Sequence, residues 1–200
     1  MARSSERDAR TRLIDATTEL MWERGYAATS PRAIMDRAEV GQGSLYHHFT
    51  GKEALAAAAF ERRAAETFAA AEALLSADRP APQRIRDYLL RQRDVLRGCP
   101  VGRMAQDADV LTSAPLQEIL RTTFSRLRGL MRAVVAEGVR TGDFPADLDP
   151  QELADTVLAV VQGGYVLARA QGSAVPFRRA VTGAVALIDH ATTPTTGSSS

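Results

Sequence analysis

Residues 25–55 read GYAATSPRAIMDRAEVGQGSLYHHFTGKEAL, and this stretch decides how the chain should fold. Ser30 and Pro31 are typical of a helix start: the serine hydroxyl can accept a free amide of the first turn, and proline has no amide to leave unpaired there. A short break follows, and a second helix is expected over 42–49. Two short helices joined by a tight break predict a helix-turn-helix motif over residues 30–49.

The second of these helices is expected to present side chains to a partner. It is about two turns long, so it buries too little apolar surface to be explained by stability alone. Leu45 and Phe49 give it one inner face. Its other positions carry groups that suit the phosphate oxygens and base edges of DNA, namely Gln42, Ser44, Tyr46, His47 and His48. Gly43 leaves room for a close approach of the backbone. For His48, a role in packing or capping is favoured over contact with a base.

The rest of the chain is predicted to be helical, which makes the fold all-α. Apolar residues recur at helical spacing, and no run alternates with polar residues as a strand would. Helices are expected over residues 7–24, 53–76, 82–97, 115–140, 150–170 and 175–190, with a short one ending near 109. Asp149, Pro150 and Glu152 form an especially strong helix start.

The composition is that of an ordinary globular protein. The chain has 200 residues, of which 45% are hydrophobic and 24% charged. No run of about 18 apolar residues predicts a membrane span, and the N-terminus does not resemble a signal peptide. The single cysteine, Cys99, fits a reducing compartment, so a cytoplasmic location is expected. The net charge of +1 neither favours nor excludes nucleic acid, so the argument depends on local arrangement.

The N-terminal stretch resembles the DNA-binding domain of TetR-type transcriptional regulators. The resemblance covers about residues 7–60. It is carried most specifically by Leu45-Tyr46-His47-His48-Phe49 followed by Lys52-Glu53-Ala54-Leu55 at a fixed offset. The chain departs from the family pattern at Glu39, where glycine is common, and at Gly41, where serine is common. Glu39 would place an anion near the DNA.

The resemblance implies a DNA-contacting role for particular residues. Thr29 and Lys52 would contact phosphates, the latter at a helix N-terminus whose free amides also favour anions. Gln42 and Ser44 would reach base edges, with Gly43 allowing the close approach. Tyr46 and His47 would contact phosphate or sugar. Lys52 is the only lysine in the chain, and its presence at this position is a small independent indication.

The resemblance also implies a domain plan. A DNA-binding domain over 7–60 would be followed by a helical ligand-binding and dimerisation domain over 61–190, and residues 191–200 are expected to be a disordered tail. The last two long helices would pair with those of a second copy, which would suit a palindromic operator read by two recognition helices. The alternative is that their apolar faces form an internal core.

The C-terminal part is expected to bind a largely apolar small-molecule effector. The run from Gly98 to Asp107 resembles a TetR subgroup typified by LmrA and YxaF. Candidate pocket residues are Tyr88, Met104, Asp107, Phe124, Leu127, Met131 and Tyr165. The alternative for the apolar members of this set is ordinary core. Cys99 could sense oxidants or be an inert thiol.

These features predict a homodimeric repressor that an effector releases from a palindromic operator. The alternatives are an activator or a protein-responsive regulator of the same fold. A helical enzyme with a partner-binding module is a further alternative, but no catalytic constellation supports it. No cofactor is expected, and no metal site, because His47 and His48 are adjacent and cannot both face one ion from a helix.

Overall fold

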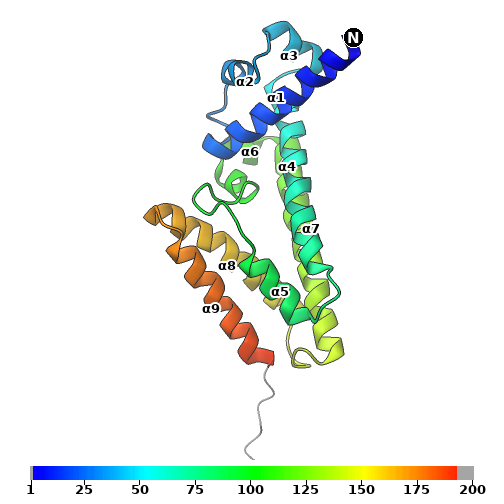
Figure 1. Cartoon of the computed structure of the whole chain (residues 1–200), viewed down its shortest axis with the longest axis vertical. Coiled ribbons are helices and arrows are strands. Elements are labelled where there is room, and N and C mark those ends of the chain that lie inside the picture. Colours follow the sequence, from blue (N-terminus) through cyan, green and yellow to red (C-terminus); the bar gives the residue numbers. More distant parts are fainter. Residues whose placement is uncertain (1, 193–200) are drawn as a thin grey trace, which may run out of the picture. The chain divides into compact units, whose positions relative to one another are not determined.

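The computed structural model describes residues 2–192 of the chain, with side chains from residue 8 onward. Over that part the secondary structure is helical and contains no strand, which confirms the predicted all-α fold (Figure 1). The elements are α1 (Ala2–Arg24), α2 (Pro31–Ala38), α3 (Gln42–His48), α4 (Lys52–Leu75), α5 (Ala81–Leu90), the 3-10 helix η1 (Gly102–Gln106), α6 (Ala108–Thr112), α7 (Ala114–Thr141), α8 (Pro150–Gln171) and α9 (Val175–Thr192).

The helices form two compact units, and the division does not follow a single cut in the sequence. The first unit comprises the described residues up to Thr67 together with Cys99–Phe124. The second comprises Phe68–Gly98 and the described residues from Ser125 onward. The sequence analysis placed Cys99–Phe124 with the second domain. The segment joins the first unit because its buried residues, such as Met104, pack in one core with Tyr26 of that unit.

The core of the first unit holds α1, α2, α3 and the start of α4 together. Leu13 of α1, Ile34 of α2, Leu45 of α3 and Leu55 of α4 belong to one apolar cluster, and each is at most 1% exposed. Burying several branched side chains of this size stabilises a domain by a few kcal/mol each, at about 1.5–3 kcal/mol per residue. The short α2 and α3 are therefore held by packing against α1 and α4 rather than by their own helix propensity.

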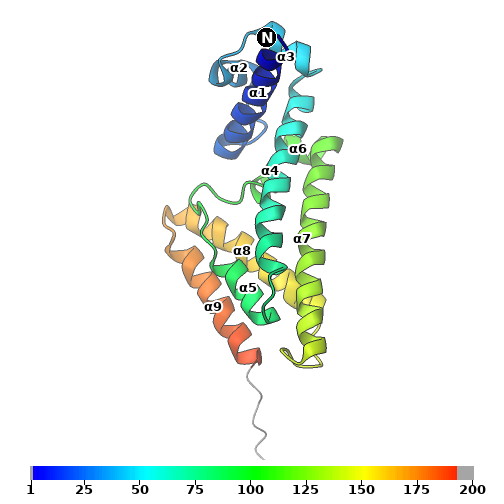
Figure 2. The same ribbon diagram turned by 45° about the vertical axis from the view of Figure 1, so that its right-hand side comes forward.

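In the second unit, α9 packs against both α8 and α5 (Figure 2). Asp149 caps α8 as predicted, since its carboxylate accepts a hydrogen bond from the Gln151 amide at 2.7 Å. A close approach of α8 and α9 occurs at Gly164, where a Cβ atom would lie 2.9 Å from Cδ2 of Phe177. Any larger residue at Gly164 would therefore push the aromatic ring of Phe177 away.

Helix α5 is shorter than the sequence predicts, because it ends at Leu90 and not near residue 97. The guanidinium of Arg93 folds back and donates to the carbonyls of Leu89 at 2.8 Å and Arg91 at 2.9 Å, and also to that of Tyr88. These are carbonyls that a helix end leaves without amide partners. The side chain of Arg93 therefore takes the place of the missing amides at the end of α5.

The C-terminal end also differs from the prediction. Residues 191 and 192, expected to begin a disordered tail, are the last residues of α9. The remainder of the predicted tail, 193–200, lies outside the described residues.

Candidate nucleic-acid interface

The turn between α2 and α3 is built by local backbone contacts. The Ser30 hydroxyl accepts a hydrogen bond from the Ala33 amide at 3.2 Å, as the sequence predicts for a helix cap. Helix α2 ends at Glu39, which has left-handed backbone angles (φ 53°, ψ 46°) and whose amide donates to the Met35 carbonyl. Glu39 is the one non-glycine residue with positive φ in the described chain. Its conformation turns the chain toward Gly41, which precedes the first residue of α3.

Arg12 of α1 fixes the end of α2 from outside the motif. Its guanidinium donates to the carbonyls of Ala38 at 3.1 Å and Glu39 at 3.3 Å. A cation at this point also interacts favourably with the C-terminal end of the helix dipole. No local sequence pattern indicates this contact, because Arg12 lies 26 positions before Ala38 in the chain.

Helix α3 has one anchored face and one exposed face. Leu45 is 1% exposed, and Phe49, directly after the helix, is 8% exposed. The outward positions are Gln42, Gly43, Tyr46 and His47, all of which are exposed. They form two pairs four residues apart, so they lie on one side of the helix. The structure therefore brings four of the predicted DNA-contacting residues together on one surface.

The two remaining polar residues of α3 are less accessible. Ser44 and His48 are half-buried. The rings of His47 and His48 meet edge to face with their centroids 5.0 Å apart. Ser44 follows exposed Gly43 and precedes buried Leu45, and its half-buried side chain remains partly accessible.

Lys52 occupies the first position of α4 and is held by an aromatic ring. Its Nζ lies 4.1 Å from the centroid of the Tyr26 ring, close enough for a cation–π contact. Burial raises the pKa of the Tyr26 phenol, and the nearby carboxylates of Glu53, Asp109 and Asp107 raise it further. The phenol therefore stays neutral, and Lys52 supplies a positive charge at the start of α4.

Thr29 is not placed as the resemblance implies. Its side chain is 1% exposed, and its hydroxyl donates to the Gly25 carbonyl at 2.6 Å. The hydroxyl therefore stabilises the bend between α1 and α2 from inside the domain. We leave Thr29 out of the proposed contact set.

The predicted effector residues divide between the two units. Met104 is 1% exposed in the core of the first unit, and Phe124 is half-buried against the same core. Asp107, also in the first unit, binds backbone amides, as described below. The predicted residues of the second unit are all buried, namely Tyr88, Leu127, Met131 and Tyr165. The effector pocket therefore stays a prediction.

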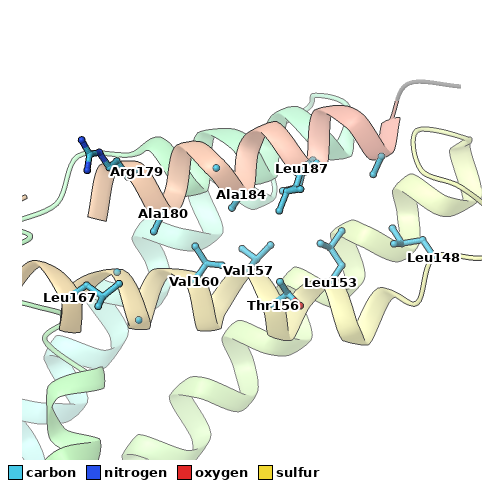
Figure 3. A pocket seen from close by; sticks show the side chains of 15 residues that line it. Leu148, Leu153, Thr156, Val157, Val160, Leu167, Arg179, Ala180, Ala184 and Leu187 are labelled. Atoms are coloured by element: carbon cyan, nitrogen blue, oxygen red, sulfur yellow. The ribbon is translucent and has the colours of Figure 1, made fainter. Parts of the chain in front are cut away.

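The second unit carries an apolar groove along α8 and α9 that includes none of those residues. Its volume is about 490 Å³. In Figure 3, Val157 and Val160 of α8 point toward Ala180 and Ala184 of α9. Leu187 on its border is 75% exposed. Apart from Thr156 and Arg179, the lining consists of apolar residues and glycine: Leu148, Leu153, Val157, Val160, Gly163, Gly164, Leu167, Ala180, Gly183, Ala184, Leu187, Ile188 and Ala191.

The described residues form neither a metal-binding cluster nor a membrane-spanning helix. Among them, no group of three or more His, Cys, Asp or Glu side chains is placed to hold a metal ion. Within the same part of the chain, no helix combines the length and the apolar character needed to cross a membrane.

Comparison with known proteins agrees with this geometry. Residues 13–59 match the model of the bacterial regulatory proteins of the tetR family, and residues 79–184 match that of the tetracyclin repressor-like C-terminal domain. The transcriptional repressor DhaR of a Mycobacterium species is 27% identical over 86% of this chain and 88% of its own. An uncharacterised regulator of Mycobacterium bovis is 32% identical over 75% of each chain.

A solved structure of similar fold points in the same direction. A TetR transcriptional regulator from Chloroflexus aurantiacus superposes with a TM-score of 0.82 at 27% identity, covering 93% of this chain and 96% of the other. These relatives are regulators rather than enzymes, which confirms that the chain was correctly predicted not to be an enzyme.

Proposed function

The chain belongs to the TetR family of bacterial transcriptional regulators, and from that premise we propose that it is a homodimer that reads a palindromic operator and releases it when a small molecule binds. The observation that carries the proposal is the exposed polar face of α3, anchored from behind by Leu45. A protein of this kind acts where the chromosome is, so we place it in the cytoplasm.

The DNA contacts are assigned by chemistry and position. Gln42 has an amide that can both donate to and accept from a base edge, and Ser44 in the same first turn of α3 supplies a hydroxyl. Tyr46, which is 55% exposed, and His47 carry donors suited to phosphate and sugar oxygens. Lys52 adds a phosphate contact at the start of α4. Gly43 lets the helix backbone come close to the groove wall.

The groove along α8 and α9 is proposed to be the dimer interface. The lining of the groove is almost entirely apolar, and a leucine at its border is exposed. Exposure of this apolar surface to water is unfavourable, and a second copy that packs on the groove would remove the surface from water. A twofold interface places two copies of α3 in a fixed relation, and a palindromic site with half-sites about 34 Å apart requires such a relation.

Effector control is proposed to act through the second unit. Tyr88, Leu127, Met131 and Tyr165 supply large, mostly apolar side chains there, which suit a largely apolar effector. An effector that prefers a conformation with wrongly placed α3 helices lowers DNA affinity by the ratio of its affinities for the two states. Repression is favoured over activation because DhaR is a repressor.

The proposal is tested by selecting DNA from a random pool with the full-length protein and footprinting the sequences that are enriched. We expect an inverted repeat, with affinity that falls steeply as salt rises because phosphate contacts release counterions. Gln42→Ala should weaken binding to the enriched sequence much more than binding to unrelated DNA. If the wild-type protein enriches no sequence, or if Gln42→Ala binds the enriched DNA as tightly as wild type, the proposed reading face is wrong.

A further inference from the structure

Asp107 makes an unusual set of contacts with the bend between α1 and α2. One carboxylate oxygen, Oδ2, accepts hydrogen bonds from the backbone amides of Tyr26 at 2.7 Å and Ala27 at 3.0 Å. The other, Oδ1, accepts from the Asp109 amide at 3.2 Å and so caps α6. Asp107 is 81 residues from Tyr26 in the chain, yet both belong to the first unit.

The bend is shaped to receive this carboxylate. Gly25 has a φ of +87°, and a Cβ atom at that position would lie 2.8 Å from Oδ2 of Asp107. Any other residue would therefore be strained and would displace the carboxylate. Hydrogen bonds from amides to an ionised carboxylate are about twice as strong as bonds between neutral groups.

The bend leads directly into the DNA-reading motif. The Thr29 amide donates to the Tyr26 carbonyl at 3.0 Å, and the Thr29 hydroxyl donates to the Gly25 carbonyl. A shift of the bend would therefore be passed to Ser30, which caps α2. Asp107 is thus connected through the bend to the residue that caps α2, although it lies far outside the motif in sequence.

A second contact reaches the other end of the motif. The Ser113 hydroxyl donates to Oε1 of Glu53 at 2.6 Å. Glu53 is in the first turn of α4, next to Lys52. Residues 107–113 therefore bind both the segment before α2 and the segment after α3.

We infer that Asp107 is a positioning residue for DNA recognition: its carboxylate holds the bend at residues 25–27 so that α2 and α3 meet DNA in the correct orientation. The inference rests on the proposed DNA-binding function. It assigns residues 107–113, which follow α5 in the chain, to the DNA-binding domain. Residues 7–60 alone therefore do not make a complete DNA-binding domain.

The direction in which one substitution changes DNA affinity distinguishes a positioning role from a purely electrostatic one. Asp107→Asn keeps the shape but removes the charge, so any bonds that the Tyr26 and Ala27 amides still donate to it are weaker. Its NH2 group also faces either those two amides or the Asp109 amide, all of which are donors. Loss of an anion near DNA should by itself favour binding, whereas loss of positioning should weaken it. We expect affinity for the DNA selected by the wild-type protein to fall about tenfold, which corresponds to the loss of one strong hydrogen bond.

Asp109→Asn is the matched control. Asp109 carries the same charge two positions along, and its side chain bonds neither Tyr26 nor Ala27. This variant should bind the selected DNA as tightly as wild type or more tightly. Ser113→Ala removes a single hydrogen bond, the one to Glu53, so it should weaken DNA binding less than Asp107→Asn does.

Two further readouts exclude a general loss of folding. A smaller folded fraction would reduce binding to selected and scrambled DNA equally, whereas a misplaced α3 should reduce binding to the selected DNA more. The slope of log affinity against log salt should stay at the wild-type value, because no phosphate contact is removed. If Asp107→Asn does not fold, Asp107→Glu decides the question by the same ratio, because it keeps the charge and moves the carboxylate away from the position that the Tyr26 and Ala27 amides bind.

Failure of the role of Asp107 and failure of the proposed DNA-binding function give different results. Unchanged or tighter binding by Asp107→Asn, or equal losses on the two DNAs, would overturn the role of Asp107 while the wild-type protein still selects its sequence. If the wild-type protein selects no sequence, the proposed DNA-binding face fails instead.

Discussion

Leu187→Asp is expected to separate the proposed dimer into monomers. Leu187 borders the groove along α8 and α9, and its side chain is 75% exposed in the single chain. In a twofold interface the same leucine is buried twice, once from each copy. The substitution removes both apolar contacts and places two carboxylates where water is excluded.

The structure sets the size of the effect. Complete burial of a leucine side chain contributes about 1.5–3 kcal/mol, so burial of the exposed three quarters contributes about 1–2 kcal/mol for each copy. The dimer therefore loses at least about 2–4 kcal/mol, and its dissociation constant rises about 30- to 1,000-fold. The cost of burying the carboxylates adds to this.

Sedimentation equilibrium over a range of protein concentrations measures that constant directly. Leu96→Asp is the control, because Leu96 is 50% exposed in the same unit but does not line the groove. We expect Leu96→Asp to dimerise like wild type and Leu187→Asp to sediment as a folded monomer with weakened operator binding. A wild-type monomer, or a Leu187→Asp dimer as tight as wild type, would refute the assignment of this groove to the interface.

Three further variants test the helix-turn-helix motif and the start of α4. Lys52→Gln should weaken binding to all DNA sequences alike and lower the slope of log affinity against log salt by about 1, as measured by fluorescence anisotropy. Glu39→Gly should raise the free energy of unfolding by up to about 1 kcal/mol, because it relieves a left-handed non-glycine residue, and should tighten DNA binding by removing an anion. Leu45→Ala should cost about 2–5 kcal/mol in urea unfolding of the first unit, because a side chain 1% exposed leaves a cavity.

Each of these has its own contrary result. Lys52→Arg keeps the charge and should retain the wild-type salt slope, so an equal drop in both lysine variants would argue against a phosphate contact. A lower unfolding midpoint for Glu39→Gly would show that the glutamate stabilises the turn. Stability of Leu45→Ala equal to wild type would show that α3 is not anchored by this residue.

The parts of the structure that depend on neighbours in the sequence could be predicted from the sequence. Ser30 caps α2 and Asp149 caps α8, because a cap bonds an amide two or three residues away. The pairing of residues on α3 also follows from spacing, since Leu45 and Phe49 are four residues apart, as are Gln42 and Tyr46.

Contacts between distant segments could not be predicted in this way. Arg93 folds back and bonds the carbonyls at the end of α5, and nothing in the local pattern of residues 82–97 indicates that contact. The burial of Thr29 and its bond to Gly25 depend on how the bend packs, so the resemblance to a family could not place its side chain. The carboxylate of Asp107 meets Tyr26 only because the chain returns to the first unit after α5.

Helices α8 and α9 also combine features that the sequence predicts with features that only tertiary packing decides. Their apolar spacing determined that α8 and α9 would form and would have apolar faces. Which faces are covered was decided only by tertiary packing, since Val157 is 1% exposed whereas Leu187 is 75% exposed. A helical pattern specifies the direction of each side chain around its own axis, but the position of the neighbouring helices determines which of those directions meets protein and which meets water.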